Sequence, residues 1–304
     1  MKRDLQRIAN TVLLYSYHTD NKGLLDGKMG IALFLYSYAR YSNGKYYSDF
    51  ADDLLDEILA SAARIPTTFE DGLTGIGWAV NYLIKNKLVE GDPNEVLNDV
   101  DKRVFSHLRC DPSISIFGHA IYLTERIRDN ANNPVFEQYI TQCLDFCHKG
   151  LNGYKGTISL NNINSILFFL IETDKMKQFN HLIKSIRVII PDVLKRISEQ
   201  KWYDSADVFI FNRIVNSIPL KQRNKWKSIS QFTFAEVSRT DDMEYFIRTS
   251  WLEELYFGEN SFKKQLTENT GTFVNDKQIN LCHNDFFFSK GLAGLGFALL
   301  SNNQ

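Results

Sequence analysis

Carboxylates are the residues of this chain whose number and placement could most directly do chemistry. Several of them stand at or near the beginnings of successive apolar, helix-like segments: Asp26, Glu70, Asp71, Asp204, Asp207, Glu253, Glu254 and Asp285. Carboxylates that face one cavity can do general acid and base work, as in glycoside chemistry. The alternative is structural, because acidic side chains commonly cap helix N-termini. Asp26 and Asp71 each directly precede a glycine, so they are predicted caps as well as catalytic candidates.

A histidine and two tryptophans are further candidates. His119 follows Gly118 at the head of an apolar segment, where it could face a central cavity as a catalytic group or lie in the core as a hydrogen-bonded histidine. Trp202 and Trp251 could stack on a substrate, with Glu254 as a further substrate contact. Sugar-binding clefts usually expose several tryptophans, and this chain has only four in all.

Two lysines and two cysteines have weaker patterns. Lys28 and Lys290 occupy similar places in the first and last apolar segments and could together bind an anionic group, although two solvated lysines are the more common outcome. Cys143 and Cys147 are four residues apart on one predicted helix face. Buried cysteine is a common core residue, so this pair is predicted to be packed rather than to bind a metal or do redox chemistry.

A repeated phrase indicates which elements position these residues. A glycine, two further residues and a second glycine open three apolar runs, with the second glycine at Gly30, Gly75 and Gly294. The first two of these glycines are 45 residues apart, and the first and last are 264 apart, which is six steps of 44. Self-similarity at such a period indicates a repeat protein. The other repeats should then begin near positions 118, 162, 206 and 250.

Each repeat is predicted to hold two helices. The segments at the repeat starts, such as residues 31–36, are apolar nearly all round, which indicates burial on more than one side. Between them lie segments with a one-sided apolar stripe, typical of surface helices; they are residues 47–64, 94–108, 134–148, 178–200 and 225–239. Seven such pairs predict an all-α, seven-fold α/α toroid of about fourteen helices in inner and outer rings, with one domain over residues 1–304. The glycines would let each inner helix start close to its neighbour.

Composition fits a compact protein and excludes some partners. The 304 residues have 35 Lys and Arg against 36 Asp and Glu, a net charge of −1. That balance gives no electrostatic case for nucleic acid or an anionic membrane surface. The apolar patch at residues 11–17 is too short and polar for a signal peptide or a membrane span, which predicts a cytoplasmic location. The four cysteines form no dense framework and are predicted to be reduced.

Three phrases in the chain resemble the inner-helix signatures of the lanthionine synthetase C-like family. They are residues 24–34, 71–78 and 291–296. The resemblance implies a seven-fold α/α toroid. It also implies a link to lanthipeptide maturation, in which bacterial cyclases add a peptide cysteine to a dehydrated Ser or Thr. In those enzymes a zinc ion binds and deprotonates the thiol, and its fourth position stays open to the substrate sulfur.

The zinc ligands that the resemblance implies are replaced in this chain. The family places one cysteine after a Trp in the sixth repeat, where Leu252 stands, and a Cys-His-Gly triplet at the seventh, where the chain has Ser289, Lys290 and Gly291. Cys282 and His283 lie seven residues upstream and could form a displaced zinc half-site, with His283 also a catalytic candidate. Alternatively, Cys282 packs in a loop and His283 faces solvent or caps a helix. Cys110 is the remaining conceivable thiol, but no spacing supports it.

These observations predict a peptide-processing role related to lanthipeptide maturation, with the usual zinc site absent or altered. The expected partner is a peptide substrate or another modification enzyme. One alternative is a carbohydrate-active toroid that uses cavity carboxylates. Another is a toroid that binds a peptide or a partner without catalysis, since a fold does not establish an activity.

Overall fold

The computed structural model describes residues 1–108, 116–130, 133–153, 158–234, 242–279 and 282–301. These residues form α-helices, short 3-10 helices and loops, and none of them lies in a strand. The all-α prediction is therefore confirmed over these ranges. No helix within them is long and apolar enough to cross a membrane.

The chain divides into two compact units, residues 1–100 with 240–304 (unit 1) and residues 101–239 (unit 2). The helices of unit 1 are α1 (Lys2–Tyr15), α2 (Lys28–Ser42), α3 (Lys45–Ala60), α4 (Leu73–Lys85), α5 (Pro93–Val96), α13 (Met243–Phe257), α14 (Lys263–Ile279) and α15 (Leu292–Leu300). Those of unit 2 are α6 (Asn98–His107, which starts in the last residues of unit 1), α7 (Ile116–Asn130), α8 (Pro134–Gly153), α9 (Leu160–Thr173), α10 (Asn180–Gln200), α11 (Ser205–Ser217) and α12 (Lys227–Ser230). Short 3-10 helices lie at Ser16–His18, Ala62–Arg64, Lys177–Phe179 and His283–Phe286. One domain over residues 1–304 stays a prediction.

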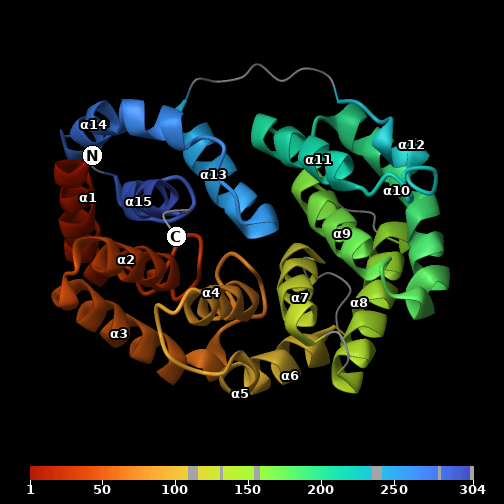
Figure 1. The fold of residues 1–304 in the computed structure, drawn as a ribbon, viewed down its shortest axis with the longest axis horizontal. Helices are drawn as coiled ribbons and strands as arrows, with labels where there is room; N and C mark the ends of the chain where they lie inside the picture. The colour runs from red at the N-terminus through yellow and green to blue at the C-terminus, as the bar shows by residue number, and fades with distance from the viewer. Residues whose placement is uncertain (109–115, 131–132, 154–157, 235–241, 280–281, 302–304) are drawn as a thin grey trace. The chain divides into compact units, whose positions relative to one another are not determined.

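Unit 1 has a row of buried helices with a cover of one-sided helices. The buried helices pack in the order α13, α15, α2 and α4, and α14, α1 and α3 lie against the outer side of this row (Figure 1). All of α15 is buried, and α2 is buried without interruption from Lys28 to Tyr36. In contrast, α3 buries only one stripe of side chains: Phe50, Ala51, Leu54 and Ile58. The predicted difference between helices buried nearly all round and helices with one buried stripe is confirmed here, whereas their arrangement in two closed rings stays a prediction.

Unit 2 has the same kind of arrangement. α7, α9 and α11 pack as a row, and α8 and α10 lie against its outer side (Figure 1). A buried ion pair joins α6 to α7, since Arg126 Nη2 is 2.8 Å from Asp101 Oδ2 and Tyr122 donates to the same carboxylate at 2.6 Å. Removing one partner of such a pair leaves an uncompensated buried charge, so the pair holds the two helices together.

The predicted repeat positions are correct for six inner helices and wrong for the sixth in the series. α2, α4, α7, α9, α11 and α15 each begin one or two residues before the predicted position. α13 instead begins at Met243, so Trp251 lies inside the helix and Glu253 and Glu254 lie in its C-terminal part. The start of α13 has no glycine. It is set by Asp242, whose side chain accepts a hydrogen bond from the Glu244 N–H at 3.1 Å.

The predicted outer segments have a similar outcome. α3, α5 with α6, α8 and α10 occupy four of the five segments, whereas α1 and α14 are outer helices that the pattern does not predict. The segment 225–239 is wrong as a long helix, because α12 ends at Ser230 and residues 231–234 are not helical. Beyond α12 the ring of Phe234 packs 5.3 Å from that of Phe211 in α11.

The repeated glycines are required by the loop that precedes each helix. Gly27, Gly72 and Gly291 are the N-cap residues of α2, α4 and α15, and their backbones are extended. A Cβ on any of them would lie under 3.0 Å from the carbonyl oxygens four and six residues earlier. A Cβ on Gly30, Gly75 or Gly294 would lie equally close to the carbonyl oxygen six residues earlier.

The main role of these glycines therefore differs from the predicted close approach of neighbouring helices. Each pair lets a loop cross directly over the start of its own helix. Approach between helices is required at Gly296 of α15, where the ring of Phe34 of α2 fills the space that a Cβ would take.

We expect Gly75→Ala to destabilise the protein by a few kcal/mol, because the added methyl meets the Phe69 backbone and the loop must shift. Gly271→Ala in α14 is the matched control. A Cβ there meets nothing within 4 Å, and alanine in a helix interior is favoured over glycine by roughly 0.5–1 kcal/mol. Urea unfolding of the two variants measures both effects. Equal stability of the two variants would contradict the role of the crossing loop.

Candidate functional site

The loops before α2, α4 and α15 meet at one end of unit 1. The N–H of Leu25 donates to the Glu70 carbonyl at 3.0 Å, and the N–H groups of Phe288 and Ser289 both donate to the Leu25 carbonyl at 3.0 Å. The loops at residues 19–27, 66–72 and 285–291 thus form one hydrogen-bonded layer, called here the glycine-loop end. It contains the first residues of the three phrases that carry the family resemblance, and the rest of each phrase lies in α2, α4 or α15.

Asp26 and Asp71 lie exposed at the glycine-loop end and bind side chains of neighbouring loops. Ser289 Oγ donates to Asp26 Oδ1 at 2.5 Å, and Asn21 Nδ2 donates to Asp71 Oδ1 at 2.6 Å. These bonds join the loop before α2 to the loops before α15 and α4. The structure thus brings both carboxylates to one end of unit 1, each with a hydrogen-bond partner.

The prediction that Asp26 and Asp71 cap helices is wrong. The N-cap residues are the glycines that follow them, and neither helix start has a side-chain cap. Loop carbonyls take the place of a cap, because the Lys28 N–H donates to the Asn21 carbonyl at 2.9 Å and the Leu73 N–H to the Pro66 carbonyl at 2.8 Å.

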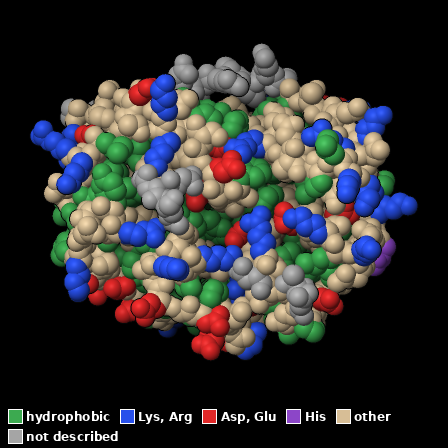
Figure 2. All heavy atoms as spheres, viewed as in Figure 1, with side chains coloured by type: hydrophobic (Ala, Val, Ile, Leu, Met, Phe, Trp, Pro, Cys, Tyr) green, Lys and Arg blue, Asp and Glu red, His purple; other side chains and the backbone are tan. Residues whose placement is uncertain are grey.

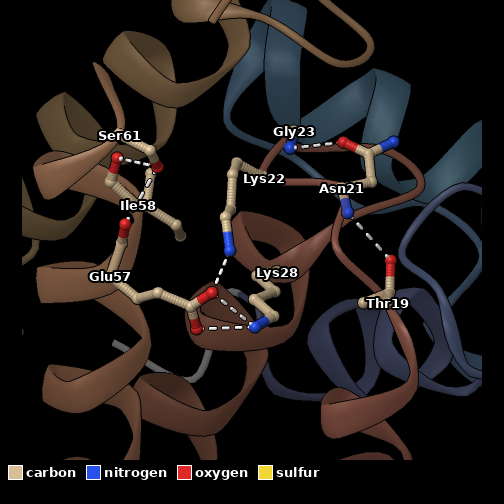
Figure 3. Close-up of polar contacts among 8 residues, drawn as sticks. All are labelled: Thr19, Asn21, Lys22, Gly23, Lys28, Glu57, Ile58 and Ser61. Carbon is tan, nitrogen blue, oxygen red and sulfur yellow. Dashed lines mark hydrogen bonds and ion pairs between the residues drawn. The ribbon is translucent and has the colours of Figure 1, made fainter. Parts of the chain in front are cut away.

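Lys28 lies beneath this layer in an ion-pair cluster with Lys22 and Glu57 (Figure 3). The Lys28 ammonium is 2.7 and 2.5 Å from the two Glu57 oxygens, and the side chain of Lys28 is only 9% exposed. Burial alone would raise the pKa of the Glu57 carboxyl, but the hydrogen bonds from Lys22 and Lys28 outweigh it and lower that pKa below its usual value. Lys290 is exposed and lies 3.8 Å from a different carboxylate, that of Glu244. An anion shared by Lys28 and Lys290 stays a prediction.

The residues at the implied zinc positions do not fit a zinc ion. Leu252 is aliphatic and 1% exposed. The hydroxyl of Ser289 donates to Asp26, and the carbonyl of Ser289 accepts the indole N–H of Trp251 at 2.9 Å. Lys290 carries an ammonium, which cannot ligate a metal while protonated. None of the three offers the thiolate or imidazole that zinc takes.

Cys282 and Asp285 form a turn beside this layer. The exposed Cys282 precedes the 3-10 helix His283–Phe286, and its N–H donates to Asp285 Oδ2 at 2.7 Å. The other oxygen of Asp285 accepts from Lys277 Nζ at 2.6 Å. Asp285, one of the predicted acids, thus joins this turn to α14 through its two hydrogen bonds.

The metal site suggested by Cys282 and His283 remains untested. The side chain of His283 and all of Cys110 lie outside the described residues. Within the described ranges, no group of three or more His, Cys, Asp or Glu residues is arranged to hold a metal ion. Zinc at Cys282 and His283 stays a prediction.

Three further unit 1 candidates lie in the body of α13. Trp251 is 5% exposed and its ring is 6.1 Å from that of Phe288, so it offers little surface for stacking on a substrate. Glu253 is fully buried and accepts two hydrogen bonds from Ser261. Glu254 accepts from the Tyr82 hydroxyl at 3.4 Å. The predicted position of both acids near the start of their helix is wrong, because α13 begins earlier than the period indicates.

In unit 2, His119 has no exposed surface and its ring lies 6.5 Å from that of Phe146. Its burial agrees with the core alternative, while the core hydrogen bond and the role in a cavity both stay predictions. Trp202 is half-buried, and its carbonyl accepts from the Leu160 N–H at 3.0 Å. Cys143 and Cys147 are fully buried free thiols. The Cys143 thiol donates a hydrogen bond to Cys147, and this bond and burial together raise the pKa of Cys143, which makes that thiol a poor nucleophile.

Asp204 and Asp207 form a capping box at the start of α11. The Asp207 N–H donates to Asp204 Oδ1 at 2.9 Å, and the Asp204 N–H reaches Asp207 Oδ2 at 3.4 Å. Asp204 thus has the capping role that is the structural alternative for this group of acids. Burial raises the pKa of Asp207 to about 7.

Two residues that organise the glycine-loop end, Asn21 and Glu57, are not among the predicted site residues. Asn21 also accepts the Gly23 N–H at 2.8 Å through its side chain, a local turn typical of Asn. Such a turn was open to prediction from the Asn-x-Gly spacing. Glu57 lies on the charged face of α3, and no local pattern distinguishes it from the four other acids of that helix as the one that binds the two lysines.

Comparison with known proteins adds no assignment. Neither protein-family models nor curated proteins give a match to this chain.

The buried carboxyl of Asp207 should make stability depend on pH. Its pKa lies above the ordinary value of 3.8, so the folded state retains a proton that the unfolded chain loses. The contribution of this carboxyl to stability is fully present below about pH 4 and is lost as the pH rises to about 7. Asp207→Asn should remove this dependence and stabilise the protein at pH 8 by a few kcal/mol, since a tenfold change in proton affinity is worth about 1.4 kcal/mol.

Urea unfolding between pH 4 and 8 measures this effect. Asp204→Asn is the matched control, because asparagine is as good an N-cap as aspartate and Asp207 is retained. An unchanged pH profile in Asp207→Asn would contradict the assignment.

Proposed function

We propose that this chain is a seven-fold α/α toroid of the lanthionine synthetase C-like kind that binds a peptide during thioether peptide maturation without a thiol-activating zinc ion. Three identical loop-to-helix crossings, at α2, α4 and α15, support the resemblance. They occur at the three phrases that the sequence shares with that family. The crossings depend on paired glycines in each case, which is a more demanding match than hydrophobic periodicity.

One observation carries the proposed loss of zinc chemistry, namely what fills the ligand positions. Leu252 is buried, and the Ser289 hydroxyl is bonded to Asp26. A peptide cysteine has a pKa near 8.5 and is mostly protonated at neutral pH unless a metal or a cation lowers that value. A peptide bound at the glycine-loop end would therefore be held or presented rather than cyclised by zinc.

The carbohydrate alternative receives less support. Trp251 is buried, and Asp26 and Asp71 are already hydrogen-bonded to side chains of neighbouring loops. An acid and base pair for glycoside cleavage needs carboxylates free to face the scissile bond.

Metal content tests the proposal directly. Wild-type protein purified without chelators should contain far less than one zinc per chain by plasma emission spectroscopy. In the presence of the wild-type protein, a model peptide with one cysteine and one dehydroalanine should cyclise at the same rate as in buffer alone. The triple variant Leu252→Cys, Ser289→Cys and Lys290→His restores the implied ligand set and should bind one zinc if the loop geometry matches the family.

Near-stoichiometric zinc in the wild type that is lost in Cys282→Ala would overturn the proposal and establish a displaced thiol-activating site. Circular dichroism of the triple variant shows whether it is folded before its metal content is interpreted.

Small-angle X-ray scattering tests the single toroid. A compact chain of this length should have a radius of gyration of about 19 Å and a single-peaked distance distribution. A markedly larger radius with a two-lobed distribution would contradict one closed domain over residues 1–304.

A further inference from the structure

The net charge of −1 conceals a division of charge between the two units. Unit 1 has 15 Lys and Arg against 23 Asp and Glu, a net charge of −8. Unit 2 has 20 Lys and Arg against 13 Asp and Glu, a net charge of +7. The whole-chain balance thus hides a basic unit, and basic surfaces attract anionic partners.

The positive charge of unit 2 is concentrated on α10 and on the chain that leads into α12. From Val208 to Phe234 there are five Lys or Arg and no Asp or Glu. The side chains concerned form what is called here the α10–α12 surface, namely Lys184, Arg187, Lys221, Arg223, Lys225 and Lys227. In Figure 2, Lys and Arg side chains stand on the part of the surface that α10 and α12 occupy in Figure 1.

Two contacts hold the α10–α12 surface together. The Arg187 guanidinium lies over the ring of the buried Trp226, 5.4 Å from its centroid. Lys225 Nζ is 3.6 Å from Asp174 Oδ2, and the Asp174 side chain is only 2% exposed. Consecutive turns between Pro219 and Trp226 are thereby fixed against α10 and the end of α9.

Four cations of this surface remain available to a partner. Lys184, Lys221, Arg223 and Lys227 are exposed, and no carboxylate of the described residues lies within ion-pairing distance of them. Lysine and arginine on flexible, solvated stems of this kind can bind carboxylates without first breaking an internal pair.

Exposed apolar side chains lie among these cations. Val188 of α10 is 70% exposed, and Leu220 at the first turn is 77% exposed. They are among the most exposed apolar side chains of the described residues. A partner that covers them gains hydrophobic as well as ionic contact.

We propose that the α10–α12 surface binds an acidic polypeptide segment that also carries apolar side chains. Its carboxylates would pair with Lys184, Lys221, Arg223 and Lys227, and its apolar side chains would cover Val188 and Leu220. The polypeptide nature of the partner rests on the proposed function, whereas the requirement for negative charge rests on this surface alone.

Nucleic acid and an anionic membrane fit the surface less well. The aromatic ring of the surface, Trp226, is fully buried and cannot stack on bases. Asp192 and Glu199 are exposed on α10 and would oppose a continuous row of phosphates or lipid headgroups. A folded or extended peptide can place its carboxylates between these two acids.

The test is fluorescence anisotropy with a labelled peptide that repeats Glu-Glu-Leu. Wild-type protein should bind it, with affinity falling as salt rises through about 0.15 M, and should bind a Lys-Lys-Leu peptide much more weakly. The double variant Lys221→Glu and Arg223→Glu should lose about tenfold or more in affinity. The matched control, Lys2→Glu with Lys264→Glu in unit 1, changes the net charge equally and should lose less than twofold.

Three outcomes would overturn the proposal. These are equal loss in both double variants, absence of measurable peptide binding, and tighter binding of duplex DNA or phosphatidylglycerol vesicles than of the acidic peptide. None of them changes the zinc content or the cyclisation result, so a failure here is distinct from a failure of the proposed function. Circular dichroism of both variants confirms that each is folded.

Discussion

The structure of unit 1 depends on six glycines. Because they have no Cβ, the backbone of a loop can cross directly over the backbone at the start of the helix that follows it. At the starts of α2, α4 and α15, loop carbonyls lie where any larger residue would place its side chain. Because the loops pass so close, their peptide groups satisfy the first N–H groups of the helices. The same loops then bond to each other through Leu25, Glu70 and Phe288. Polar side chains on this layer, including Asp26 and Asp71, are positioned by the layer and not by the helices below it.

This constraint explains which elements could be predicted from the sequence. A glycine pair marks a crossing loop, so the starts of α2, α4 and α15 follow from it directly. α7 keeps one of the two glycines, and α9 and α11 have neither. These helices still keep the spacing, because a helix pair of constant size sets the period. α13 departs from the period, since Asp242 caps it and no glycine fixes its start. An N-cap search would have located that start, whereas counting in steps of 44 placed it inside the helix.

The candidate site was less predictable than the fold. Asp26 and Asp71 were recognised as a pair at equivalent positions, and the structure brings them to the same end of unit 1. Their predicted capping role is wrong because the glycines that follow them are the N-cap residues and loop carbonyls accept the first helical N–H groups. The cluster of Lys22, Lys28 and Glu57 joins residues 29 and 35 positions apart, and local spacing carries no information on such pairs. The division of charge between the units appears only when the compact units are known, because the totals for the whole chain cancel.

The hydrogen bond from Ser289 to Asp26 joins residues 263 positions apart, and it has a consequence for how the protein is made. α2 packs against α15, which is synthesised only after the whole of unit 2, whereas unit 2 is one uninterrupted stretch of chain. At about 5–20 residues per second, residues 1–100 wait about ten to forty seconds for α15 while the middle of the chain is synthesised and can fold. During that interval the apolar surfaces of α2 and α4 are not covered by all their packing partners. The newly made segments that contain these two helices are therefore the ones that need protection by chaperones.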